Sequence, residues 1–364
     1  MAQIVFGLGA LGLMLVLLVV CLTGWTWVYF RVSRGEAILQ QESGETISWG
    51  LIDIVALIVT VAVLIGMFQV GGLIATGAKF PINPDTLTTN QRASMIMAFA
   101  AAELLTVLAI AKLISLRGFG LQLFGKRGEQ FSSDLLLGCM AFGMLVVPTL
   151  ILQTILALLQ PYEHELINML IKDRSVPMAF ASVAAAVFAA PLFEEFAFRG
   201  LLQGWLQDMW DGRLSTASVF VGRIRRYWQA EPLPELVAAT ATSAESAEVA
   251  SSFADSSDNP FDSPQSEVIV ASAVSDEALP IERSPAQLYG PILISAALFA
   301  LMHLGQGLAP IPLFFLALGL GYLYQRTRRL TPCVVVHFLL NGQSMALLMI
   351  QVFVVGDDAA LIAN

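Results

Sequence analysis

Charged residues make up only 13% of this 364-residue chain, against about 25% in a typical soluble domain. Hydrophobic residues reach 57% and fall in long blocks. An ordinary soluble domain is therefore excluded, and an integral, multi-pass membrane protein is predicted. No basic patch with interleaved aromatic residues accompanies the net charge of −9, so we expect no nucleic-acid partner.

Cysteine is also rare. Cys21, Cys139 and Cys333 all lie in apolar blocks, and no Cys-x-x-Cys pair occurs. This pattern favours neither a disulfide framework nor a cysteine-based zinc site. The N-terminus has no basic residue ahead of its apolar run at 4–30. That run is longer than the apolar part of a signal peptide, so we interpret it as the first membrane helix.

Eight apolar segments are long enough, or nearly long enough, to span a bilayer. They predict an all-α fold, a polytopic membrane helical bundle of about eight transmembrane helices. We divide it into an N-terminal four-helix membrane region at 1–160 and a second membrane domain at 176–355. The sixth and seventh segments are short and the turn at 305–307 is uncharged, which favours a hairpin that turns within the membrane. The segments are residues 4–30, 50–74, 93–116, 134–159, 176–206, 289–304, 308–325 and 332–355.

The distribution of Lys and Arg predicts the orientation. With both termini outside, the cytoplasmic loops carry thirteen of these residues and the outside loops carry four, in agreement with the positive-inside rule. The segment at about 229–285 holds eleven acidic residues and one Arg, without a lasting hydrophobic period. We expect a disordered acidic cytoplasmic insertion, with a docking segment for a partner as the alternative.

A few ionisable residues interrupt the apolar blocks, where each costs about 2.5–3.5 kcal/mol to insert. The fifth segment contains Glu194, Glu195 and Arg199, and the sixth and eighth contain His303 and His337, two of only three histidines. Glu195 and Arg199 are four residues apart, in the order that favours an ion pair. Glu194 lies about 100° around the helix, away from Arg199, where it suits a general base.

Two further pairs are spaced by one helical turn. His337 and Asn341 share a face, and both can donate hydrogen bonds to an oxyanion. Phe299 precedes His303 by four residues, so its ring is expected to pack against the imidazole and orient it. In a convergent arrangement, Glu194 and His303 activate a water molecule, while His337 and Asn341 stabilise the tetrahedral intermediate of peptide hydrolysis.

A metal ion is the other way to activate that water. Glu194, His303 and His337 could supply the His₂Glu set of a catalytic zinc site. The sequence has no His-Glu-x-x-His motif, and we expect no second carboxylate that orients the imidazoles. Zinc stays open as a cofactor, and a metal-free Glu/His mechanism is slightly preferred.

In this order, Glu-Glu-x-x-x-Arg, Phe-x-x-x-His and His-x-x-x-Asn resemble the motifs of the CPBP family (CAAX prenyl endopeptidases and bacteriocin-processing proteins, also called Abi). The resemblance covers about residues 176–350. It implies a CPBP-type intramembrane protease, a hydrolase often labelled a metalloprotease, with an all-helical membrane fold and a cavity open to one side. It also implies a peptide or protein substrate, with or without a lipid anchor, and a membrane-lipid environment. Prenylated CAAX tails are the family's eukaryotic substrate.

The same resemblance implies roles for individual residues. Glu194 corresponds to the catalytic glutamate, His303 and His337 to the essential histidines and Asn341 to the oxyanion partner. Glu195, Arg199 and Phe299 complete the motifs as supporting residues. The acidic insertion departs from the family, which usually joins its first two motif helices by a short loop.

Two other functions remain as alternatives. One is a non-catalytic membrane scaffold or regulator with the same fold. The other is a proton-coupled transporter that uses Glu103, Glu194 and the histidines as a relay, although no inverted repeat supports it. We interpret Glu103 and Asp53 as polar groups in helix packing, and His164, beside two glutamates, as a solvated loop residue.

Overall fold

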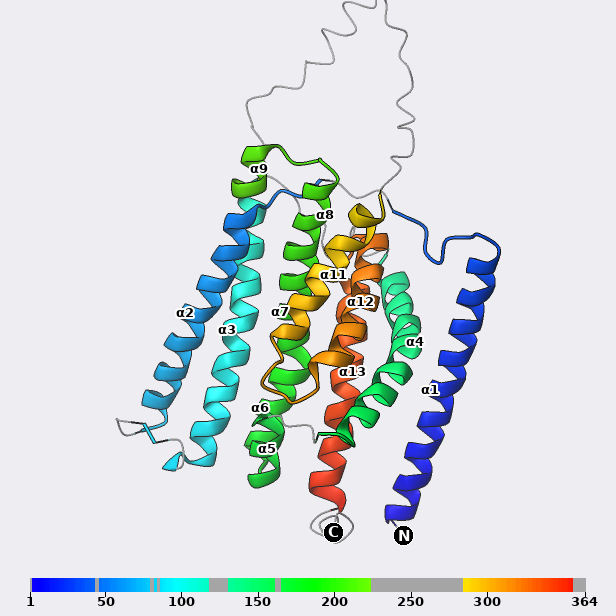
Figure 1. Cartoon of the computed structure of the whole chain (residues 1–364). Coiled ribbons are helices and arrows are strands. Elements are labelled where there is room, and N and C mark those ends of the chain that lie inside the picture. The colour runs from blue at the N-terminus through cyan, green and yellow to red at the C-terminus, as the bar shows by residue number, and fades with distance from the viewer. Residues whose placement is uncertain are drawn as a thin grey trace, which may run out of the picture. The chain divides into compact units, whose positions relative to one another are not determined.

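The computed structural model describes residues 2–42, 46–78, 82–83, 86–117, 130–160, 165–223 and 284–355. Every regular element in these ranges is a helix, and the helices run roughly side by side (Figure 1). The predicted all-α membrane bundle is therefore confirmed. The acidic insertion lies outside the described residues except for its last two positions, and His164 lies outside them as well.

Each of the eight predicted segments contains a helix. Within the described ranges, six helices are long and apolar enough to cross a membrane, and α11 is a shorter apolar helix. The fifth predicted segment is a composite of five short pieces, and two short helices, α5 (Glu165–Lys172) and α9 (Thr216–Val221), were not predicted. The remaining helices are α1 (Ala2–Ser33), α2 (Leu51–Ala75), α3 (Thr89–Leu116), α4 (Phe131–Ala157), α6 (Val176–Val183), η3 (Ala184–Ala189), α7 (Ala190–Glu195), η4 (Phe196–Gln203), α8 (Gly204–Trp210), α11 (Pro285–Leu301), α12 (Pro310–Thr327), α13 (Thr331–Ile350) and η5 (Gln351–Val355).

Local sequence sets where several helices begin. The Ser284 hydroxyl caps α11 by accepting from the backbone N–H of Gln287, and the Gln287 side chain accepts from the Ser284 N–H in return. This reciprocal capping box satisfies two amide groups that a helix start leaves unpaired. Proline occupies the first turn of α11, α12 and α13, where its missing N–H has no helical partner to lose.

Helix α13 lies within the bundle and packs against α4, α7, α12 and η3. At Gly138 of α4, an added Cβ would lie 2.6 Å from the Val335 side chain and 2.9 Å from the Pro332 carbonyl oxygen. Small residues permit such close contact between membrane helices. Helices of both predicted regions, 1–160 and 176–355, belong to one compact unit that comprises residues 1–224 and 283–364.

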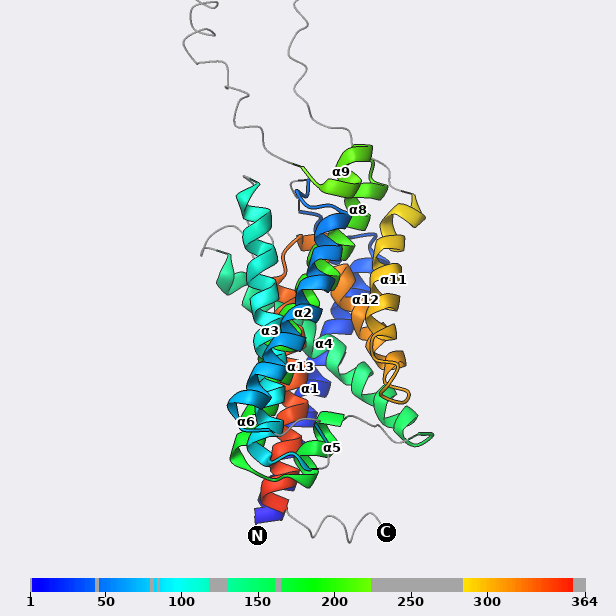
Figure 2. The ribbon, with the colours of Figure 1, turned by 90° about the vertical axis from the view of Figure 1, so that its left-hand side faces the viewer.

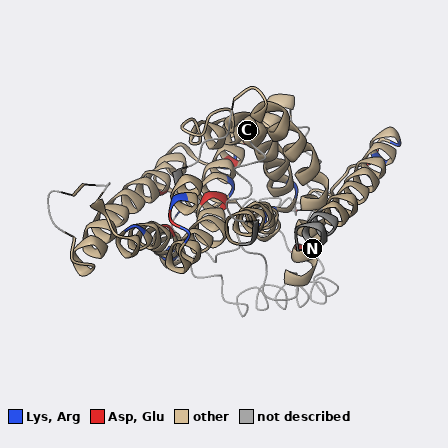
Figure 3. Cartoon of the chain, turned by 90° about the horizontal axis from the view of Figure 1, so that it is seen from below, with Lys and Arg blue, Asp and Glu red and all other residues tan. Residues whose placement is uncertain are grey.

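The outward faces of the long helices are apolar. Val19 on α1, Met67 on α2 and Leu108 on α3 expose 62%, 62% and 64% of their surface, which suits contact with lipid rather than water. Seen from below, charged residues occupy only a few positions of the described chain (Figure 3).

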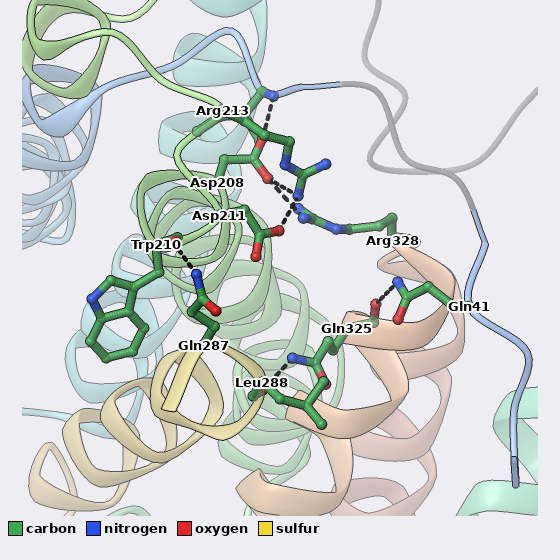
Figure 4. Close-up of polar contacts among 10 residues, drawn as sticks. Gln41, Asp208, Trp210, Asp211, Arg213, Gln287, Leu288, Gln325 and Arg328 are labelled. Atoms are coloured by element: carbon green, nitrogen blue, oxygen red, sulfur yellow. Dashed lines mark hydrogen bonds and ion pairs between the residues drawn. The ribbon is translucent and has the colours of Figure 1, made fainter. Parts of the chain in front are cut away.

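A polar network joins the helices at one end of the bundle (Figure 4). Asp208, at the end of the fifth span, forms ion pairs with Arg213 and Arg328 and accepts from the Ile47 N–H at 2.8 Å. Burial lowers the pKa of the Arg328 guanidinium, but Asp208, Tyr324 and Asp211 together outweigh this effect and the pKa is raised. The Gln287 amide donates to the Trp210 carbonyl oxygen at 3.1 Å. The network therefore fixes the start of α11 to the end of α8.

The same end of the bundle carries further ion pairs. Arg117 pairs with Asp53 at 2.7 Å, and Arg329 pairs with Asp134 at 2.8 Å. The described ends of the chain, at the start of α1 and the end of η5, both lie at the opposite end (Figures 1 and 2). Basic residues thus gather where the sequence predicts the cytoplasmic loops. The orientation relative to the membrane stays a prediction.

The hairpin of α11 and α12 is shorter than its neighbours. Its turn ends well before the lower end of α13 in both side views (Figures 1 and 2). Met302 and Leu304 in this turn expose 75% and 65% of their surface. The turn is therefore apolar on its outer side and sits part-way along the bundle.

Candidate active site

The fifth span changes its helical winding on both sides of the glutamate pair. The π-helical segment η3 precedes α7, and the π-helical segment η4 follows it directly after Glu195. Such wide turns are rare in proteins and are often found at functional sites. Pro191 lies in the first turn of α7, where it removes one backbone donor. The two glutamates thus lie at the end of a six-residue α-helical segment between two π-helical ones.

Glu195 and Arg199 form the ion pair predicted from their spacing. The Arg199 Nη1 and Glu195 Oε1 atoms are 3.1 Å apart, and both side chains are buried, with exposures of 1% and 0%. The Arg199 guanidinium carbon also lies 4.5 Å from the centre of the Phe299 ring, within the range of a cation–π contact. Helix α11 therefore supplies an aromatic surface for the buried charge of the fifth span.

His337 lies between the two glutamates. Its Nδ1 is 2.8 Å from Glu195 Oε1, and its Nε2 is 3.6 Å from Glu194 Oε2. A carboxylate can only accept, so the short contact fixes the proton of the neutral ring on Nδ1. The expectation that no carboxylate orients the imidazoles is therefore wrong for His337. The sequence could not show this partner, because 142 positions separate the two residues.

The two adjacent glutamates differ in exposure, as their angular separation on a helix predicts. The Glu194 side chain is 21% exposed and the Glu195 side chain is fully buried. The distance of 3.6 Å between His337 Nε2 and Glu194 Oε2 is too long for a direct hydrogen bond, so each atom keeps the capacity to bond to a third molecule beside them. The arrangement provides an oriented imidazole nitrogen and an accessible carboxylate facing the same place.

His303 lies in the turn after α11, two residues past the last helical position. Its Nδ1 is 2.9 Å from the Phe299 carbonyl oxygen, so Nδ1 carries the proton and Nε2 is left as an acceptor. The Phe299 ring centre lies 5.0 Å from the His303 ring and 5.9 Å from the His337 ring. Phe299 thus contacts both imidazoles, in agreement with its predicted packing role.

Glu194 and Asn341 have partners in the structure that the sequence did not predict. Among the described residues, the ion pair within 4 Å of Glu194 involves His337 and not His303. Asn341 donates from Nδ2 to the Ala186 carbonyl oxygen at 2.9 Å, so the eighth span is tied to the π-helical segment η3. Ser295, which the sequence did not single out, donates to the Phe198 carbonyl oxygen at 2.9 Å and fixes α11 against η4.

The sequence leaves zinc open, with Glu194, His303 and His337 as its possible ligands. In the part of the chain that the structure describes, no group of three or more His, Cys, Asp or Glu side chains is gathered closely enough to hold a metal ion. The donors therefore do not fit a preformed zinc site in this arrangement.

Comparison with known protein families matches one part of the chain. The family model described as Rce1-like, type II CAAX prenyl endopeptidase, matches residues 280–343. No curated protein and no solved structure matches this chain. The matched segment contains the second and third motifs, from Phe299 to Asn341, and the first motif lies before it. Residues 280–343 are thus Rce1-like in sequence, and the resemblance of this chain to the CPBP family of CAAX prenyl endopeptidases is confirmed.

Proposed function

We propose that this protein is an intramembrane endopeptidase that hydrolyses a peptide bond with a water molecule held between Glu194 and His337. The observation that carries the proposal is the position of the His337 ring, with Nδ1 at 2.8 Å from Glu195 and Nε2 at 3.6 Å from Glu194. The Rce1-like match at residues 280–343 supports the reaction class. The helical bundle and its apolar surface support a site within the membrane.

Glu194 acts as the general base. It takes one proton from the water as the water oxygen bonds to the carbonyl carbon of the substrate, and it returns that proton to the leaving amine nitrogen when the C–N bond breaks. Positioned proton transfer of this kind contributes about 10²–10⁴-fold to a rate. Glu194 suits this role because its side chain is partly accessible, at 21%, whereas that of Glu195 is fully buried.

Glu195 and Arg199 position His337. Glu195 accepts from His337 Nδ1 and from Arg199 Nη1, so the ring is held in one orientation with Nε2 toward the water. A histidine held by a buried carboxylate keeps the correct tautomer and is stabilised when it takes up a proton. Nε2 of His337 accepts from the attacking water and then from the hydroxyl that this water leaves on the tetrahedral intermediate, so His337 stabilises the intermediate without a further proton.

By the resemblance to the CPBP family, His303 and Asn341 act on the substrate side of the site. The His303 Nε2 is available to an incoming group because its Nδ1 donates to Phe299. The Asn341 amide bonds to Ala186 through one N–H, and its second N–H can donate to the oxyanion. The substrate class is a membrane-associated peptide, for which a lipidated C-terminal tail is the first choice.

The test uses purified full-length protein in nanodiscs and two quenched fluorescent peptides, one with a farnesylated CAAX tail and one with the same tail unmodified. Wild-type protein is expected to cleave, and Glu194→Gln and His337→Ala are each expected to lose at least about 10²-fold in kcat. His164→Ala is the matched control, since it removes the third histidine outside the predicted motifs. Folding of every variant is checked by thermal unfolding.

The outcomes separate the alternatives. A scaffold would show no cleavage of either peptide and would keep its binding partner in Glu194→Gln. A proton-coupled transporter would show pH-driven uptake in proteoliposomes without cleavage. Cleavage by folded Glu194→Gln at the wild-type rate would refute the proposed mechanism.

A further inference from the structure

Glu103 is a buried carboxyl group that the proposed mechanism leaves unused. It lies near the middle of α3 and only 4% of its surface is exposed. Among the described residues, no hydrogen-bond donor reaches its Oε2 atom. A charged carboxylate is unfavourable in a membrane span. A group that is both buried and unsatisfied therefore calls for a functional explanation.

The packing of α3 brings Glu103 to the level of the glutamate pair. Ala100 on α3 packs in one cluster with Ala185 and Ala189 of the fifth span. Both helices run in the same direction along the bundle (Figures 1 and 2). Glu103 lies three residues beyond Ala100, and Glu194 lies five residues beyond Ala189, so each is about one turn farther toward the same end. Helix α3 also packs directly against α7, which carries Glu194.

On the described elements α2, α6 and η3, no cation offsets this pair of acids, and His337 of α13, whose Nε2 lies 3.6 Å from Glu194, bonds through Nδ1 to Glu195. The only charged residue of α2 is Asp53, which is paired with Arg117, and α6 and η3 contain no charged residue. Arg199 is already paired with Glu195. Two like charges in an apolar environment favour a state in which one of them carries a proton. Since Glu103 is the more buried of the two, the proton is expected to reside there.

We propose that Glu103 is a positioning residue of the candidate site, a neutral carboxylic acid that donates a hydrogen bond to Glu194, directly or through one water molecule. This bond holds the Glu194 carboxylate in one orientation and keeps it as the charged member of the pair. The inference rests on the proposed function, because it takes Glu194 as the general base. It makes α3, which lies outside the three motifs, part of the catalytic apparatus.

Kinetics test this role with a conservative and a non-conservative variant. Glu103→Gln keeps a neutral donor of the same size, and it is expected to retain kcat within about threefold. Glu103→Leu removes the donor, and it is expected to lose at least about tenfold in kcat with KM unchanged. Thr106→Val is the matched control, because Thr106 is also fully buried on α3 and its hydroxyl donates only to Ala102 of its own helix. A carboxyl group with only a packing role would leave the kcat of Glu103→Leu at the wild-type level, and that result overturns the proposal.

A second readout needs no activity. Infrared spectra of the wild-type full chain are expected to contain the C=O band of a protonated carboxyl group. This band is expected to disappear in Glu103→Gln and to shift in Glu194→Gln. If wild-type protein cleaves nothing but the band behaves in this way, the carboxyl pair is supported and only the proposed function fails. A band that Glu194→Gln leaves unchanged overturns the pair, even where the peptides are cleaved. The spectra also decide the question if Glu103→Leu does not fold.

Discussion

Replacing Glu195 with glutamine removes one of two charges that are fully buried together. Arg199 has Glu195 as its ion-pair partner at 3.1 Å, and its Nε and Nη2 atoms find no other acceptor among the described residues. Breaking a buried pair from one side destabilises a protein by about 3–5 kcal/mol. The glutamine oxygen can still accept one hydrogen bond and the Phe299 ring still lies against the guanidinium. We therefore expect Glu195→Gln to lower the free energy of unfolding by about 3 kcal/mol, the lower limit of that range.

The same substitution is expected to impair catalysis, because Glu195 also fixes the His337 ring at 2.8 Å. Loss of the carboxylate that holds a catalytic histidine can lower kcat by about 10⁴-fold. The double variant Glu195→Gln/Arg199→Met separates the two effects. It removes both charges and fills the space with a flexible apolar chain, so stability is expected to return to about the wild-type level. The kcat value is not expected to recover.

Thermal unfolding followed with a thiol-reactive dye measures the stability change. Cys21 and Cys333 are buried, whereas Cys139 is exposed. A Cys139→Ser background therefore makes dye labelling depend on unfolding. Glu195→Gln is expected to unfold several degrees below this background and the double variant close to it. Unfolding of Glu195→Gln at the background temperature, or recovery of kcat in the double variant, would contradict the assignment of Glu195 as both ion-pair partner and histidine support.

The remaining predictions concern packing, metal dependence and orientation. Asp208→Asn removes the shared partner of two arginines and is expected to lower stability by about 3 kcal/mol, measured by the same unfolding assay. Gly138→Val places side-chain atoms against α13 and is expected to destabilise by about 1–3 kcal/mol, whereas Gly66→Val, with open space around it, is the neutral control. The metal-free mechanism predicts that 1,10-phenanthroline leaves peptide cleavage unchanged, and inhibition that added zinc reverses would establish metal dependence. The positive-inside rule predicts that a cysteine at Arg34 is labelled by an impermeant maleimide only from the cytoplasmic side.

The membrane spans could be predicted from the sequence because length, hydropathy and charge are local properties. The segment predicted at 332–355 corresponds to a helix that begins at Thr331. The boundary of the sixth span was less accurate, because α11 ends at Leu301 and leaves His303 in a turn. Hydropathy continues through that turn, since Met302 and Leu304 are apolar, and so the pattern gives no sign of where the helix ends.

The contacts between helices could be predicted only in part. The Glu195–Arg199 pair follows from spacing on one helix and is confirmed. The contact of His337 with Glu195 depends on how the fifth and eighth spans are rotated toward each other, which no local pattern encodes. The π-helical winding of η3 and η4 affects that rotation, and segments of six and eight residues are too short to reveal a changed helical period in the sequence.

Helix geometry explains how the adjacent residues Glu194 and Glu195 can both contact His337. Neighbouring side chains on a helix diverge by about 100°, so an imidazole that enters between them meets each through a different ring nitrogen. His337 does so with contacts of 2.8 Å and 3.6 Å. Moving the imidazole by one turn of α13 would displace it by about 5.4 Å, which exceeds both distances. Exchanging His337 and Asn341 therefore keeps the composition of the site but removes both contacts, so position along α13, and not the mere presence of a histidine, sets the chemistry.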